Sequence, residues 1–129
     1  MAKSESSAVV TPLVDISRLS KVLSQFATER DWDQFHSPKN LVMALAGETG
    51  ELVEIFQWMS EESSKLAGDS PSTSKAVRDE LADVLIYLVR IADKLGVDLN
   101  AAVFEKLAQN ASKYPVSTSR GNSRKYTDL

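Results

Sequence analysis

The sequence predicts an all-α domain with four main helices. Apolar residues recur at intervals of three and four in four segments, which is the spacing of one face of an α-helix. Strand-like alternation is missing, apart from a short apolar run at 84–89. Five glycines and four prolines in 129 residues leave long stretches free of helix breakers. Each apolar stripe is broad for a bundle of four helices, so we expect the bundle to oligomerise.

A capping residue introduces each of the first two helices. Asp15 is a good N-cap for a helix over 16–30, whose apolar residues form one stripe. A loop over 31–36 follows. Ser37 and Pro38 are suited to the N-cap and the first turn of the second helix, which is predicted to reach residue 59.

The second half of the chain carries two more predicted helices. A serine-rich connector over 60–74 contains Gly and Pro and is expected to be mobile. The third helix is predicted over 75–95 and ends at Gly96, the residue type that most easily adopts a left-handed conformation. Asp98 caps the fourth helix, which ends before Pro115 because the residue preceding a proline avoids the α region.

These helices define one domain, residues 15–116, between two polar tails. The N-terminal tail, 1–14, is expected to be disordered and lacks the features of a secretory or transit signal. The C-terminal tail, 117–129, is polar and basic. No window approaches the roughly 18 apolar residues of a membrane span. A net charge of −3 gives no basic footprint for a nucleic-acid polymer. We therefore expect a cytoplasmic protein that binds neither membranes nor nucleic-acid polymers.

Acidic residues occupy positions where a buried helix face calls for apolar ones. At 100° per residue, Glu48 lies inside the apolar stripe of the second helix and Glu51 lies at its edge. Glu80 and Asp83 repeat this arrangement on the third helix. Burying unpaired carboxylates is costly, and no Lys or Arg shares these faces near the acids. Hard divalent cations, Mg²⁺ foremost and Mn²⁺ as an alternative, resolve the conflict.

The acids allow two other interpretations. A single Glu-x-x-Glu pair is more often part of a solvated helix face, but two pairs set into apolar stripes favour a metal site. A di-iron bundle needs Glu-x-x-His on two helices. The only histidine, His36, lies in a predicted loop, and the chain has no cysteine to supply thiolate ligands. Glu54 lies further round the second helix and fits a surface residue, a general base or a supporting group equally well.

The acid motifs carry a family resemblance. The segments 47–52 (GETGEL) and 80–84 (ELADV) resemble the MazG-type all-α nucleoside triphosphate pyrophosphohydrolases, although Gly47 replaces the first Glu of their signature. Lys106, Asn110 and Lys113 resemble the family's fourth-helix motif, with Lys113 where Arg is frequent. Several further segments resemble the dCTP pyrophosphatase branch of this family, and with them the resemblance extends over residues 16–129. These segments are 30–32, 34–36, 38–41, 56–58, 83–88, 114–116 and 125–129.

The resemblance implies an activity and a site. It implies Mg²⁺-dependent hydrolysis of dCTP, including 5-modified dCTPs, to dCMP and pyrophosphate in the control of nucleotide pools. It also implies a homotetramer with active sites between helices and subunits. The residues that match the family's metal ligands are Glu48, Glu51, Glu80 and Asp83. The positions that resemble its nucleoside pocket are Trp32, His36, Trp58 and Tyr87.

Physical chemistry leads to the same reaction class. Divalent cations let a triphosphate and an acidic cluster occupy one site and support in-line attack on the α-phosphorus. Glu51 or Glu54 would orient the attacking water, and the sequence does not decide between them. Cationic side chains would contact the remaining phosphate oxygens. The candidates are Lys94, Lys106, Lys113, Arg120 and Lys125, with Lys106 and Asn110, one helical turn apart, the strongest pair.

Several candidate substrate contacts also have a purely structural interpretation. Trp32 and Trp58 would stack on a base, or else belong to the core. From sequence alone His36 is a loop or capping residue, and Asn40 either reaches the sugar or a phosphate or completes the start of the second helix. Two alternative functions therefore remain open. One is a non-catalytic oligomeric helical module with a regulatory divalent-cation site, and the other is hydrolysis of another nucleoside triphosphate.

Overall fold

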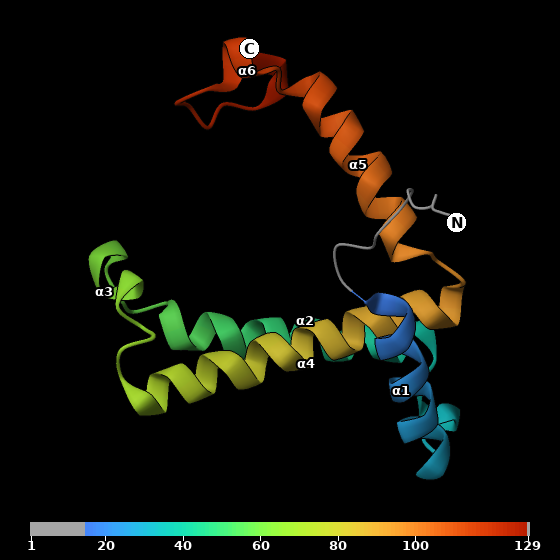
Figure 1. The fold of residues 1–129 in the computed structure, drawn as a ribbon. Coiled ribbons are helices and arrows are strands. Elements are labelled where there is room, and N and C mark those ends of the chain that lie inside the picture. The colour runs from blue at the N-terminus through green and yellow to red at the C-terminus, as the bar shows by residue number, and fades with distance from the viewer. Residues whose placement is uncertain (1–14, 129) are drawn as a thin grey trace, which may run out of the picture. The chain divides into compact units, whose positions relative to one another are not determined.

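The computed structural model describes residues 15–128, and that range is helical, with no strand (Figure 1). The predicted all-α class is confirmed. The expected disordered tail at 1–14 lies outside the described residues. No helix in the described range is long and apolar enough to cross a membrane. The six α-helices are α1 (Ile16–Glu29), α2 (Pro38–Phe56), α3 (Glu61–Lys65), α4 (Pro71–Leu95), α5 (Leu99–Lys113) and α6 (Val116–Ser119). Two 3₁₀ turns accompany them, η2 (Asp33–Phe35) and η3 (Tyr126–Asp128).

The predicted capping residues hold the ends of the long helices. The side chains of Asp15, Ser37 and Asp98 accept hydrogen bonds from backbone N–H groups in the first turns of α1, α2 and α5, at 3.0–3.1 Å. Each cap satisfies a backbone donor that has no partner inside the helix. Gly96 ends α4 in the left-handed region, with φ = 67°.

The region around the serine-rich connector differs from the prediction. α2 ends at Phe56 rather than at residue 59, and the four-residue start 71–74 that was assigned to the connector belongs to α4. Pro71, which the sequence places in the connector, occupies the first turn of α4, where its missing N–H costs nothing. Within the connector, the Ser60 side chain accepts a hydrogen bond from the Ser63 N–H and caps the short helix α3. Within residues 15–128 the four predicted main helices are present as α1, α2, α4 and α5, and the short helices α3 and α6 are additional.

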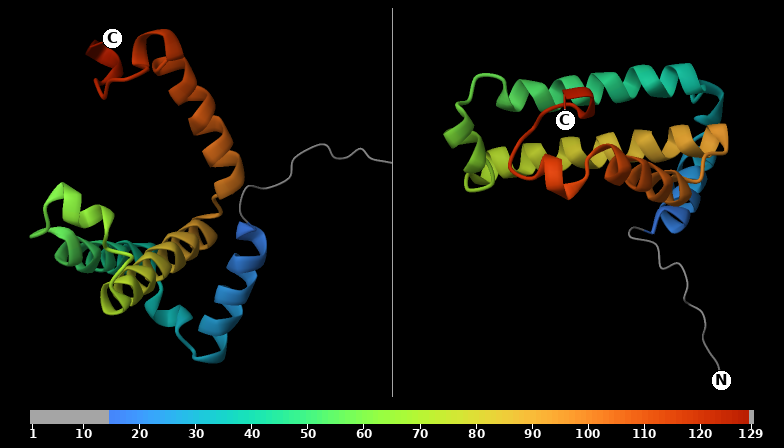
Figure 2. Two further views of the ribbon diagram at one scale, coloured as in Figure 1. Left: turned by 60° about the vertical axis from the view of Figure 1, so that its left-hand side comes forward. Right: turned by 90° about the horizontal axis from the view of Figure 1, so that it is seen from above.

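The described residues form two compact units, Asp15–Val97 and a second that begins at Asp98. In the first unit, α2 and α4 lie side by side along most of their lengths, and α1 packs on α4 (Figures 1 and 2). Leu41 from α2 and Val89 from α4 are the largest fully buried side chains. This packing brings the acidic face of α2 against that of α4.

The core of this unit is small, and many large apolar side chains are exposed. Besides Leu41 and Val89, only Ala27 and Ala92 are buried apolar residues in the described range. The exposed apolar side chains of the unit include Phe35, Met43, Val53, Trp58, Leu66, Leu81 and Leu95. The unit by itself therefore leaves many large apolar side chains in contact with solvent.

We expect Leu41→Ala to destabilise the protein by about 2–5 kcal/mol, because the substitution leaves a cavity between α2 and α4. Leu41 is 1% exposed. The matched control is Leu66→Ala at a position that is 62% exposed, with an expected change within about 0.5 kcal/mol. Urea unfolding at one fixed protein concentration measures both. Equal effects of the two substitutions would contradict the packing described here.

Candidate active site

Three of the four predicted metal-ligating acids converge between α2 and α4. Glu48 comes from α2, and Glu80 and Asp83 come from α4. Each offers one carboxylate oxygen, and these oxygens all lie within 4.8 Å of one another. All three residues are half-buried. The three acids converge because each lies on the face by which α2 and α4 pack against each other.

Glu51, at the edge of this cluster, shifts the pKa values of Glu48 and Glu80. The adjacent Glu51 carboxyl, together with burial and the charges of Glu51, Asp83 and Glu80, raises the pKa of Glu48 to about 7. Burial, followed by the Glu51 carboxyl and the neighbouring acidic charges, raises the pKa of Glu80. Burial, hydrogen bonding to Glu51 and repulsion between neighbouring negative charges therefore all favour the protonated forms of Glu48 and Glu80.

Within residues 15–128, no Lys or Arg forms a salt bridge with any acid of this cluster. The Glu48 Oε2 atom is buried and has no hydrogen-bond partner in that range. The unpartnered Glu48 oxygen and the two neighbouring carboxylates together form a set of hard oxygen donors with no positive charge to balance them. These donors fit a hard divalent cation.

A shallow hollow of about 340 Å³ extends from the acids along α2 and α4. It is lined by Glu51, Glu54, Ile55, Ala76, Asp79 and Glu80. Glu54 therefore shares one surface with Glu51 and Glu80. Both residues that the sequence proposed for orienting a water molecule border this hollow.

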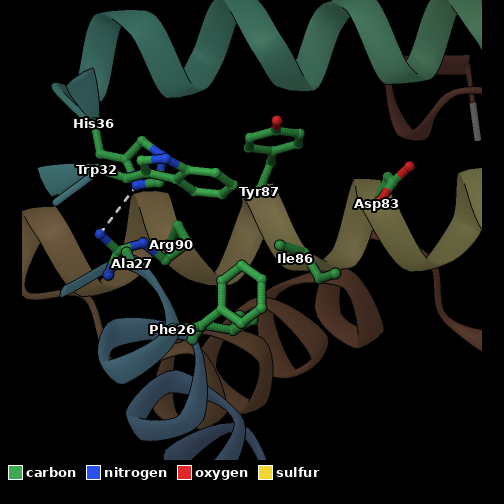
Figure 3. A pocket seen from close by; sticks show the side chains of 9 residues that line it. Phe26, Ala27, Trp32, His36, Asp83, Ile86, Tyr87 and Arg90 are labelled. Atoms are coloured by element: carbon green, nitrogen blue, oxygen red, sulfur yellow. Dashed lines mark hydrogen bonds between the residues drawn. The ribbon is translucent and has the colours of Figure 1, made fainter. Parts of the chain in front are cut away.

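An apolar pocket of about 300 Å³ lies beside the acids, between α1, the η2 turn and α4. In Figure 3, Asp83 lies at one end of the pocket, Trp32 and His36 lie at the other, and Tyr87 stands between them. The Trp32 ring packs edge-on against Phe26, with ring centroids 5.8 Å apart. Because Asp83 belongs both to this pocket and to the acidic cluster, a molecule bound in the pocket would reach the acids with one end.

A charged cluster that the sequence did not predict lies at the Trp32 and His36 end of the pocket. Its centre is Arg90 of α4, whose side chain is 3% exposed. Arg90 Nη2 donates to Asp33 Oδ1 at 3.0 Å, and Nη1 donates to Asp93 Oδ2 at 3.1 Å. Lys94 Nζ also donates to Asp33 Oδ1, at 2.9 Å. We call Asp33, His36, Arg90, Asp93 and Lys94 the Arg90 cluster.

Charge in the Arg90 cluster shifts two pKa values. Hydrogen bonds from Lys94, Arg90 and Thr28 lower the pKa of Asp33 to about 2. Burial and the positive charge of Arg90 lower the pKa of His36. The sequence carries one signal for the Arg90 cluster, which is that Arg90 interrupts an otherwise apolar stretch of the third predicted helix.

The structure places three other predicted contacts outside the pocket lining. Lys94 is engaged with Asp33 in the Arg90 cluster. The Asn40 side chain donates to the Phe35 carbonyl at 3.1 Å and so ties the η2 turn to the start of α2. Trp58, in the turn after α2, is 88% exposed and does not line the pocket.

The remaining predicted phosphate contacts lie in the unit that begins at Asp98. Lys106 is exposed and Asn110 is half-buried, one turn apart on α5. Lys113 Nζ lies 4.9 Å from the centre of the Tyr126 ring, against which Tyr114 packs edge-on. Arg120 follows α6, and Lys125 precedes η3; both are exposed.

Comparisons with known proteins agree with the site and the fold. The MazG-like family model matches residues 44–129. Over 117 residues, 91% of this chain, the sequence is 50% identical to proteins named dCTP pyrophosphatase 1 from Rattus norvegicus and Homo sapiens, and it covers 67% of each. A crystal structure of a pyrophosphatase from Archaeoglobus fulgidus matches 83% of this chain and 98% of its own, with a TM-score of 0.72 and 33% identity. These matches confirm the resemblance seen in the acid motifs: the chain belongs to the MazG-like family.

Proposed function

We propose that this protein hydrolyses dCTP to dCMP and pyrophosphate. The observation that carries the proposal is that Asp83, one of three converging carboxylates, also lines an apolar pocket that contains three aromatic side chains and an imidazole. Such an arrangement suits a molecule with a flat base at one end and phosphates at the other. The relatives named dCTP pyrophosphatase 1, 50% identical over 91% of this chain, support dCTP as the substrate.

Mg²⁺ is the proposed cofactor, with Mn²⁺ as a substitute of similar chemistry. Glu48, Glu80 and Asp83 would hold it, because their oxygens form the hard donor set that lacks positive charge. Glu51, whose carboxyl adjoins Glu48, is the fourth proposed ligand. When bound, the cation offsets the charge of the triphosphate and polarises the α-phosphoryl group. Glu51 or Glu54, which border the same hollow, orients the water for in-line attack on the α-phosphorus.

The apolar pocket is the proposed nucleoside site. Trp32 and Tyr87 supply faces on which a base stacks, and His36 supplies a polar contact at the end opposite Asp83. Asn40 supports this end of the pocket, because its hydrogen bond to the Phe35 carbonyl holds the η2 turn. That turn lies between Trp32 and His36 in the chain. Trp58 is proposed to contact a nucleoside from its exposed position, with its other face covered by a second copy of the chain.

A homotetramer is the proposed assembly, with each site completed between subunits. The exposed apolar side chains of the unit Asp15–Val97 support self-association, since the unit buries few apolar residues by itself. Lys94, which the sequence suggested as a phosphate contact, is instead engaged by Asp33 in the Arg90 cluster. The proposed phosphate contacts are the basic and amide side chains Lys106, Asn110, Lys113, Arg120 and Lys125. Their charge or hydrogen-bond donors would meet phosphate oxygens that the cation leaves uncovered.

We expect Glu48→Gln and Glu80→Gln each to lower kcat for dCTP by about 100-fold or more, because each removes one of few anionic donors for the cation. Glu62→Gln is the matched control, since Glu62 is exposed on α3 and pairs only with Lys65. Chromatographic product analysis with Mg²⁺, with and without EDTA, measures the effect. Formation of dCDP and phosphate would contradict attack at the α-phosphorus. Mg²⁺ binding without turnover would favour a regulatory cation site instead.

We expect the stability of the metal-free protein to fall as pH rises from about 4.5 to 7. The pKa of Glu48 is raised from 4.5 to about 7, so the folded protein holds a proton that the unfolded chain releases in this range. Below this range that stabilisation is fully present, and it is lost as pH passes the folded pKa. Chemical unfolding in EDTA measures the profile.

Glu48→Gln is the control for this pH dependence, because the amide cannot titrate. The difference between the variant and the parent protein also removes the contribution of His36, whose lowered pKa acts in the opposite direction. Mg²⁺ should stabilise the parent protein more at pH 8 than at pH 5, since it competes with the bound proton. Parallel pH profiles of variant and parent would contradict this assignment.

A further inference from the structure

The Arg90 cluster restricts the state of His36 through the chemistry of one nitrogen. Arg90 Nη2 lies 3.2 Å from His36 Nδ1, the contact drawn as a dashed line in Figure 3. A guanidinium has only hydrogen-bond donors. Nη2 carries two hydrogens, and Asp33 Oδ1 takes one of them at 3.0 Å. The second hydrogen faces Nδ1, so Nδ1 must be the acceptor.

An accepting Nδ1 fixes the proton of the neutral imidazole on Nε2. A protonated imidazole would turn an N–H toward the guanidinium and place two positive charges in contact. Burial and the Arg90 charge also lower the pKa of His36, which agrees with a neutral ring. Within residues 15–128, Nε2 has no hydrogen-bond partner, and His36 lines the pocket. The pocket therefore offers a substrate one N–H donor of fixed identity.

Packing alone does not account for an arginine at this position. Moving a guanidinium out of water is costly, and its Nε atom is buried without a partner in the described range. Asp33 already receives a hydrogen bond from Lys94, so it does not depend on Arg90 for a counter-charge. The contact with His36 is what Arg90 adds that Lys94 does not.

We propose that Arg90 is a positioning residue that locks His36 in the Nε2–H tautomer and thereby selects cytosine over uracil and thymine. This inference rests on the proposed function. All three bases present O2 as an acceptor, but only cytosine also presents N3 as an acceptor, so a fixed donor that meets N3 selects cytosine. Uracil and thymine carry a proton on N3, so the locked imidazole faces a donor there. An unlocked imidazole could exchange tautomers and accept from that N3–H, which would relax the choice of base.

The tautomer is measured directly in the full-length protein, because His36 is its only histidine. A long-range ¹H–¹⁵N NMR spectrum, recorded where the ring is neutral, should show a pyrrole-type Nε2 and a pyridine-type Nδ1. In Arg90→Met the spectrum should shift toward a mixture of tautomers. A pyrrole-type Nδ1 in the parent protein would overturn the proposal. This measurement needs no substrate and does not depend on a variant that folds, so it stands apart from the proposed reaction.

Kinetics test the consequence for substrate choice. In Arg90→Met the ratio of kcat/KM for dCTP to that for dUTP should fall roughly tenfold, mainly through a higher KM for dCTP. Asp93→Asn is the matched control: it breaks the Nη1 ion pair of the same guanidinium but keeps the Nη2 contacts, so the ratio should hold. An unchanged ratio in a folded Arg90→Met protein, or an equal loss in both variants, would overturn the specificity role. Absence of dCTP hydrolysis in the parent protein would refute the proposed function while leaving the tautomer result intact.

Discussion

Repulsion among carboxylates that face one another across α2 and α4 is the constraint on which the site depends. Glu48, Glu80 and Asp83 offer oxygens within 4.8 Å of one another. The hydrogen bond with Glu51, burial, and the charges of Glu51, Asp83 and Glu80 together raise the pKa of Glu48 to about 7. The packing of α2 on α4 holds these charges together without a basic residue among them. A divalent cation and a triphosphate together would relieve this repulsion, which links the fold to the proposed chemistry.

The two ends of the pocket differ in charge balance: the charges of the acids are unbalanced, whereas those of the Arg90 cluster are balanced. At the Asp83 end, negative charges lack partners and attract cations. At the far end, Arg90 and Lys94 are balanced by Asp33 and Asp93, so that end is electrically satisfied and holds its geometry. The Asp83 end suits phosphates and a metal ion, whereas the end at Arg90 and His36 suits the fixed hydrogen bonds that distinguish one base from another.

The sequence predicted those parts of the molecule that depend on local periodicity. The rotation of 100° per residue placed Glu48 and Glu80 in their stripes, and the caps Asp15, Ser37 and Asp98 marked true helix starts. It missed the Arg90 cluster because Arg90 and Asp33 are 57 residues apart and meet only through tertiary packing. It also assigned Pro71 to a connector, because a proline at a first helical position and a proline in a loop look alike locally.

The central claim, that water attacks the α-phosphorus of a nucleotide held between the pocket and the acids, is tested most directly by hydrolysis of dCTP in ¹⁸O-labelled water. Mass spectrometry of the two products locates the new oxygen. The account predicts one ¹⁸O atom in the phosphate of dCMP and none in pyrophosphate. Label in pyrophosphate would show attack on the β-phosphorus and would contradict the proposed geometry.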